Sequence, residues 1–149
     1  MSIRFQRREI PFDGVWEMIW NEAIQHVSLS VTNLQAAKHF YENVLCLTEI
    51  DRPPFDSEGV WYKIGNQQLH LLVDENSQTL RKQHNLVSTE GHMALRIADF
   101  QAAVEWLTKH HIEFREDVNG VSGFDQIFLN DPDGNLIELN VEQTRQEEG

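Results

Sequence analysis

Two stretches of the chain restate one another: Gly91-His92-Met93-Ala94-Leu95-Arg96-Ile97-Ala98-Asp99-Phe100 and the earlier Gln25-His26-Val27-Ser28-Leu29-Ser30-Val31-Thr32-Asn33-Leu34. In both, a histidine begins an alternating apolar run, and the tripeptide Gln-Ala-Ala follows. His92 follows His26 by 66 residues, and the residues around them keep the same interval. A constant interval over many residues indicates an internal duplication.

A second match lies near the ends of the two halves. Residues 68–73 (Gln-Leu-His-Leu-Leu-Val) align with residues 136–141 (Leu-Ile-Glu-Leu-Asn-Val) at an interval of 68. The two additional residues fall in the loop Asp131-Pro132-Asp133-Gly134-Asn135, where the first half has the tighter Gly65-Asn66-Gln67. Proline, glycine and aspartate are typical turn residues, so this acidic loop is predicted to be a hairpin turn and not a metal site.

Each half is predicted to contain four strands and one helix. Apolar alternation and helical spacing place strands at 24–31, 45–51, 59–64 and 68–73 and a helix at 34–44 in the first half. The second half has predicted strands at 92–97, 112–115, 126–129 and 136–141 and a helix at 100–109. The predicted fold class is therefore α+β, with two tandem βαβββ modules that form a curved, cup-like mixed sheet.

The repeat also predicts how the chain is organised. Residues 23–141 are expected to form a single domain, with module one at 24–73, a connector at 74–90 and module two at 91–141. Residues 1–22 are an N-terminal extension, in which apolar residues at helical spacing after Asp13 predict a short helix. Residues 142–149 form a charged tail.

Composition narrows the class of protein. A net charge of −12 argues against nucleic acid and against anionic membrane surfaces, since both require basic patches. No run of residues approaches the roughly 18 apolar residues that a membrane span needs, so a cytoplasmic protein is expected. Cys46 is the only cysteine, which excludes an intrachain disulfide, and its leucine neighbours predict a buried, inert thiol.

Four potential metal ligands stand at equivalent places in the two halves: His26 and His70 in the first, His92 and Glu138 in the second. Strand alternation puts all four on the face opposite the core. Burying an unpaired polar group in an apolar strand costs free energy, so these four side chains are expected to share a ligand. Three imidazoles and a carboxylate suit Zn²⁺, Ni²⁺, Co²⁺, Mn²⁺ or Fe²⁺, whereas Mg²⁺ and Ca²⁺ prefer oxygen ligands. The sequence therefore predicts a divalent transition-metal site inside the cup.

These features together resemble the vicinal oxygen chelate superfamily, which includes glyoxalase I, extradiol dioxygenases, methylmalonyl-CoA epimerase and bleomycin resistance proteins. The resemblance covers about residues 24–141 and rests on the paired modules, the helix start at 34–41 and the segment 131–138. It implies that His26, His92 and Glu138 are the histidine, histidine and glutamate that most metal-binding members share. His70 stands where glyoxalase I has a second glutamate and the epimerase a glutamine, so the chain departs from both.

The resemblance implies a metal-dependent, glyoxalase-like enzyme of the isomerase or lyase type. Its small substrate would be chelated through adjacent oxygens while Glu138 transfers a proton. A non-haem Fe(II) extradiol-type dioxygenase is an alternative, because two histidines and one carboxylate leave positions open for substrate and O₂. A resistance protein that sequesters a small molecule without catalysis is a further alternative, which the retention of all four ligands disfavours.

A homodimer is expected, because one module alone exposes its ligand-bearing face and needs a second module to close the pocket. The second module can come from the same chain or from a twofold-related copy, and the connector at 74–90 is long enough for either. Pairing between chains would join His26 and His70 of one subunit to His92 and Glu138 of the other. The sequence leaves both pairings open.

Overall fold

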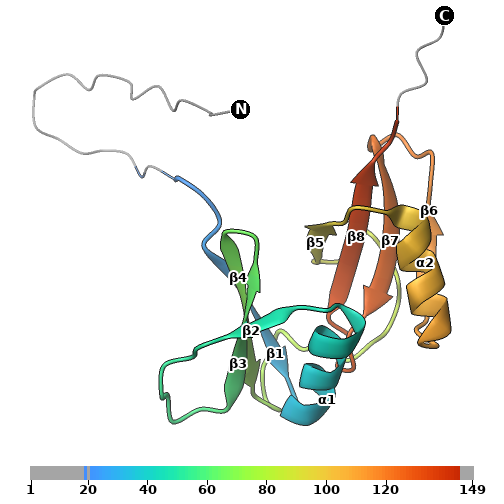
Figure 1. Ribbon diagram of the computed structural model, residues 1–149. Coiled ribbons are helices and arrows are strands. Elements are labelled where there is room, and N and C mark those ends of the chain that lie inside the picture. The colour runs from blue at the N-terminus through green and yellow to red at the C-terminus, as the bar shows by residue number, and fades with distance from the viewer. Residues whose placement is uncertain (1–18, 20, 145–149) are drawn as a thin grey trace, which may run out of the picture.

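Residue 19 and residues 21–144 are described by the structure, a computed structural model (Figure 1). Module one contains β1 (His26–Val31), α1 (Leu34–Lys38), η1 (His39–Val44), β2 (Thr48–Ile50), β3 (Gly59–Ile64) and β4 (Gln67–Val73). The helix predicted at 34–44 is thus α-helical only to Lys38 and continues as the π-helix η1. There the amide of Leu45 donates to the carbonyl of Phe40, five residues back, at 3.0 Å.

Module two repeats this order of elements. It contains β5 (Met93–Arg96), α2 (Phe100–Lys109), β6 (Phe114–Asp117), β7 (Phe124–Asn130) and β8 (Leu136–Glu142). The equivalent residues Asn33 and Asp99 begin the two helices by accepting hydrogen bonds from the amides of Ala36 and Ala102, each at 2.9 Å. All eight predicted strands are present, with ends shifted by a few residues.

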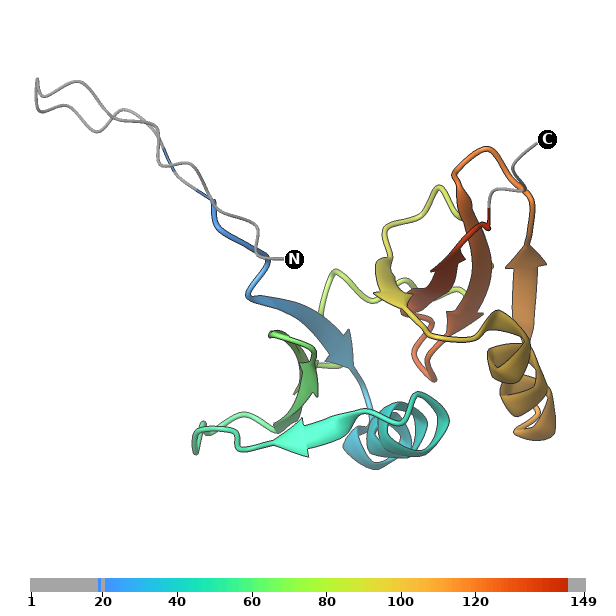
Figure 2. The ribbon, with the colours of Figure 1, turned by 45° about the horizontal axis from the view of Figure 1, so that its top comes forward.

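The two sheets have the same strand order, β1-β4-β3-β2 in module one and β5-β8-β7-β6 in module two. In each sheet the first and last strands of the module pair in parallel, and the other neighbours are antiparallel. Figures 1 and 2 show them as two twisted sheets on opposite sides of the molecule. The predicted α+β fold of two βαβββ modules is confirmed.

Some predictions lie outside what the structure describes. The helix predicted after Asp13 falls mainly on residues outside the described part of the chain, and it stays a prediction. Among the described residues, no helix is both long and apolar enough to cross a bilayer.

One hydrophobic core continues through both modules. Fully buried side chains reach it from η1, β4, β7 and β8, and they include Tyr41, Leu69, Leu71, Leu129 and Ile137. In Figures 1 and 2, α1 lies between the two sheets. Residues of α2 line a cavity between the two modules together with residues at the end of η1. The modules therefore pack on each other through the helical sides of both.

The loop between β7 and β8 anchors module two on module one. The Tyr41 hydroxyl donates to Asp131 Oδ2 across 2.9 Å, and the two side chains are only 0% and 2% exposed. Asn135 donates from its amide to the backbone carbonyl of Ser30, also at 2.9 Å. The 131–135 loop is a turn, as predicted, in which the amide of Asp131 donates to the carbonyl of Asn135. Its contact with module one, here called the loop contact, was not predicted.

The Tyr41–Asp131 hydrogen bond links a neutral donor to a buried carboxyl group. Burial raises the pKa of the Tyr41 hydroxyl well above its usual value, and the neighbouring Asp131 raises it further. The phenol therefore keeps its proton and donates it to the hydrogen bond. Burial also raises the pKa of Asp131, although hydrogen bonds from Asn135 and Tyr41 act in the opposite direction.

Replacing Tyr41 by Phe should remove the hydroxyl while keeping the ring packed. We expect the free energy of unfolding to fall by about 1–3 kcal/mol, because a buried carboxyl group loses a donor. Urea denaturation at pH 7 measures this change. Tyr62→Phe is the control, since the Tyr62 hydroxyl donates to Glu42 at 3.0 Å in a partly buried contact. Equal losses in the two variants would contradict a special role for the loop contact.

Candidate functional site

In module one, His26 and His70 lie side by side on the sheet. Their ring centroids are 4.2 Å apart and their planes differ by 14°. The register explains this, because His70 pairs with Ser28 and side chains two residues apart on a strand share a face. Trp61, directly opposite His70 on β3, stacks on the other side of His70 at 3.9 Å and 3°. We call the column of Trp61, His70 and His26 the aromatic stack.

The aromatic stack restricts what His70 can do. His70 is 7% exposed, and burial lowers the pKa of its imidazole, with His26 and Arg52 acting in the same direction. The ring is therefore neutral near pH 7 and keeps a nitrogen lone pair. A metal ion bonds an imidazole nitrogen in the plane of the ring, and two nearly parallel rings 4.2 Å apart share no plane. In this conformation His26 and His70 cannot both ligate one ion.

In module two, His92 and Glu138 meet directly, with His92 Nε2 2.9 Å from Glu138 Oε2. Glu138 is 4% exposed, and its other oxygen, Oε1, accepts hydrogen bonds from the amides of Gln126 and Asn140 at 2.8 Å each. Burial by itself raises the pKa of Glu138, but the hydrogen bonds from Asn140, Gln126 and His92 outweigh it and the pKa is lowered. Glu138 is therefore held as a buried anion.

Both ring nitrogens of His92 face hydrogen-bond acceptors. Nδ1 lies 2.7 Å from the backbone carbonyl of Glu90, and Nε2 faces the carboxylate of Glu138. A neutral imidazole has only one N–H, so this arrangement calls for a second proton or for a cation at Nε2. A divalent transition ion fits the arrangement, because histidine ligands commonly donate their second N–H to a carbonyl oxygen.

The two pairs occupy equivalent places in the duplicated modules. Glu138 pairs with Ala94 on β5 in the same way as His70 pairs with Ser28 on β1. Phe128 lies opposite Glu138 on β7, at the position that corresponds to Trp61. His70 and Glu138 thus occupy equivalent positions in the strand pairing of the two modules, as the repeat predicts.

Three residues around the second pair were missed by the sequence reasoning: Gln126, Phe128 and Asn140. Phe128 meets the His92 ring edge-on, with centroids 5.6 Å apart and planes at 80°. The sequence could have indicated these residues, because side chains two positions apart along a strand share a face. Gln126 and Phe128 on β7, like Glu138 and Asn140 on β8, have this spacing.

The four predicted ligands come together as two pairs, one on each sheet. Within residues 21–144, no group of three or more histidine, cysteine, aspartate or glutamate side chains is placed to hold one ion. The physical reason is the packing of the modules, which meet through their helical sides and the loop contact. One chain therefore holds the four predicted ligands as two separate pairs, here called the half-sites.

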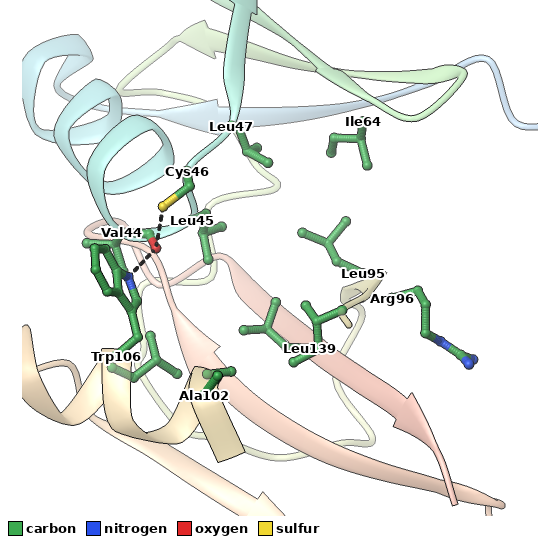
Figure 3. A pocket seen from close by; sticks show the side chains of 13 residues that line it. Val44, Leu45, Cys46, Leu47, Ile64, Leu95, Arg96, Ala102, Trp106 and Leu139 are labelled. Atoms are coloured by element: carbon green, nitrogen blue, oxygen red, sulfur yellow. Dashed lines mark hydrogen bonds between the residues drawn. The ribbon is translucent and has the colours of Figure 1, made fainter. Parts of the chain in front are cut away.

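A separate apolar cavity of about 400 Å³ lies between the modules (Figure 3). Trp106 donates its indole N–H to the carbonyl of Val44 across 2.9 Å at this cavity. Cys46 lines the cavity and is exposed, which corrects the prediction of a buried thiol. Its left-handed backbone (φ 56°) follows the end of η1, between Leu45 and Leu47, which both pack against the core. None of the four predicted ligands lines this cavity, so it is not the candidate metal site.

The similarity of this chain to known proteins agrees with its observed fold. The family model described as Glyoxalase/Bleomycin resistance protein/Dioxygenase superfamily matches residues 23–139. Mitochondrial methylmalonyl-CoA epimerase from Homo sapiens is 30% identical over 149 aligned positions, which cover 93% of this chain and 85% of the human protein.

Solved structures share the fold. A glyoxalase family protein from Bacillus anthracis superposes with a TM-score of 0.72 at 24% identity, covering 85% of this chain and 99% of that chain. A mutant of the fosfomycin resistance protein FosX from Listeria monocytogenes, complexed with Mn(II) and 1S,2S-dihydroxypropylphosphonic acid, superposes with a TM-score of 0.67 at 19% identity. This match covers 85% of this chain and 97% of the FosX chain.

Proposed function

Because the chain belongs to the glyoxalase/bleomycin resistance protein/dioxygenase superfamily, we propose that it is a metal-dependent, glyoxalase-like enzyme of the isomerase or lyase type. The substrate is a small molecule chelated through adjacent oxygens. His26, His92 and Glu138 are the ligands, and Glu138 is also the catalytic residue. His70 can join them as a fourth ligand only if its ring leaves the aromatic stack. The observation that carries the proposal is the buried, ionised Glu138 beside His92, whose two ring nitrogens both face acceptors.

A divalent transition ion (Zn, Ni, Co, Mn or Fe), when bound, supplies Lewis-acid polarisation of the substrate oxygens. Glu138 accepts a proton from the carbon beside a polarised carbonyl and returns it to the substrate. Gln126 and Asn140 both donate to Oε1 of Glu138, so Oε2 is the oxygen turned toward His92. These two amides orient Glu138 and keep it unprotonated at the start of the reaction.

We propose that each complete site forms between two copies of the chain in a homodimer. The half-sites lie on different sheets, and α1 occupies the space between those sheets (Figure 1). A twofold axis can place module one of each subunit against module two of the other. The dimer then contains two complete sites, each made from one half-site of each kind. The facing sheets then exclude water from both pockets.

One observation favours a second function, a non-haem Fe(II) extradiol-type dioxygenase. His70 is stacked between Trp61 and His26 and does not share a ligand plane with His26. The remaining set of two histidines and one carboxylate is the one that leaves positions open for substrate and O₂ in such enzymes.

Assays of the metal-reconstituted protein separate the two functions. We expect turnover of methylglyoxal in the presence of a thiol, with no consumption of O₂. Oxygen uptake with catechol, seen only after loading with Fe²⁺, would support the dioxygenase and contradict the glyoxalase-like reaction. Binding of these compounds without turnover in either assay would argue for a sequestering protein.

Replacing Glu138 by Ala should abolish tight metal binding, with a loss of at least about 100-fold in affinity, and Asn140→Ala should cost about 10–100-fold because Asn140 orients Glu138. Equilibrium dialysis followed by metal analysis measures both effects. Glu105→Ala is the control, since Glu105 is exposed on α2. Undiminished metal stoichiometry in Glu138→Ala would show that the ligand assignment is wrong.

Mixing two inactive variants tests the assembly. His26→Ala and Glu138→Ala homodimers each lack a ligand in both sites, but a heterodimer of the two has one intact site if sites form between chains. Random mixing should then restore about one quarter of the wild-type metal sites and activity. If sites form within one chain, every site in the mixture stays broken. A monomer by light scattering, with metal bound, would also exclude the proposed assembly.

A further inference from the structure

We propose that Arg115 binds an anionic end of the substrate, a carboxylate or phosphate group, so that the enzyme acts on small molecules that carry an oxyanion beyond the chelated oxygens. This inference rests on the proposed function, because the chelated end of the substrate is assigned to the metal site.

Arg115 lies on the same face of the second sheet as Glu138. It pairs with Phe128 on β7, and Phe128 pairs with Glu138 on β8. Residues directly opposite one another on neighbouring strands share a face, so the three side chains form one row across the sheet. Two strand spacings put Arg115 roughly 10 Å from Glu138.

Phe128 holds the guanidinium group of Arg115 in place. The guanidinium carbon lies 4.9 Å from the centroid of the Phe128 ring. The same fully buried ring meets His92 edge-on. A guanidinium group stacked on a ring keeps its N–H edges free to donate within its own plane. The Phe128 ring therefore contacts both Arg115 and His92 and links the arginine to the pair formed by His92 and Glu138.

Arg115 differs from the other arginines of residues 21–144 in having no polar partner there. The others donate hydrogen bonds: Arg52 to Ser57 at 3.0 Å, Arg81 to Asn130 at 2.9 Å and Arg96 to Asn140 at 2.8 Å. Arg96 also forms an ion pair with Glu142 at 3.2 Å. In a chain with a net charge of −12, a half-buried arginine without a carboxylate partner is a donor set that an anionic ligand can complete.

The spacing between Glu138 and Arg115 defines the shape of the ligand. A substrate chelated at the metal and bonded to Arg115 needs a few methylene groups between its two ends to span the roughly 10 Å across the row. The compound 2-oxoglutarate has adjacent carbonyl and carboxylate oxygens at one end and a second carboxylate at the other, which makes it a suitable probe.

The experiment compares three probes of equal chain length by calorimetry on the full chain loaded with Mn²⁺. They differ only at the far end: 2-oxoglutarate has a carboxylate, 2-oxo-4-phosphonobutyrate a phosphonate and 2-oxopentanoate a methyl group. Charge-assisted hydrogen bonds predict that at least one anionic probe binds about tenfold or more tightly than the methyl probe. Whichever anion binds more tightly distinguishes a carboxylate substrate from a phosphate substrate.

Variants then assign the preference to Arg115. We expect Arg115→Met to abolish the preference while leaving the affinity for 2-oxopentanoate within about threefold. Arg115→Lys should keep part of the preference, because the charge remains but the bidentate fork is lost. Lys109→Met is the control, since it removes the same charge from the end of α2 and should leave the preference unchanged.

Several results would overturn the inference. The wild-type protein could show no preference among the probes, or Arg115→Met could weaken all three equally, which would indicate a structural role. Loss of the preference in Arg52→Met instead of Arg115→Met would place the anion in module one. If Arg115→Met does not fold, the wild-type protein and Arg115→Lys still decide the question. A prior Mn²⁺ titration keeps the proposals distinct: absent Mn²⁺ binding contradicts the metal site, whereas normal binding without an anion preference overturns only the role of Arg115.

Discussion

The parallel pairing of the first and last strands in each module is the constraint on which the site depends. Side chains alternate along a strand, so a shift of one residue in either pairing would turn His70 or Glu138 toward the core. Apolar neighbours prevent such a shift. Leu69 and Leu71 flank His70 and are fully buried, and the neighbours of Glu138 are nearly so. The polar face of each sheet is therefore set by the burial of its apolar face.

Local periodicity explains why so much of the fold was predictable. The order of elements along the chain and the facing of His92 and Glu138 follow from alternation and from the duplication, both of which are visible in the sequence. The change from α- to π-helix after Lys38 and the exposed Cys46 were not predictable, because they depend on how the end of the helix meets the second module. The same limit applies to the loop contact and to the packing that separates the half-sites, since no local pattern encodes contacts between distant residues.

The duplication has kept the framework and changed its chemistry. In module one, the equivalent positions carry imidazole and indole rings, and the counterpart of Asn140 is the apolar Leu72. In module two, amides hold a carboxylate in its ionised form. The polar face of module one is thus aromatic, whereas that of module two is polar and carries a carboxylate anion. In the proposed site, a bound molecule would meet a different chemistry on each side.

The loop contact has a consequence for how the chain is made. It joins Ser30 to Asn135, 105 residues apart, and Tyr41 to Asp131, 90 residues apart. Module one is therefore complete on the ribosome long before its partners in this contact exist. Contacts over such distances slow folding, and an incomplete chain leaves apolar surface and strand edges uncovered. The nascent first module must stay soluble without its covering loop, so a chain that stops before residue 131 loses part of the stability of the module it has already made.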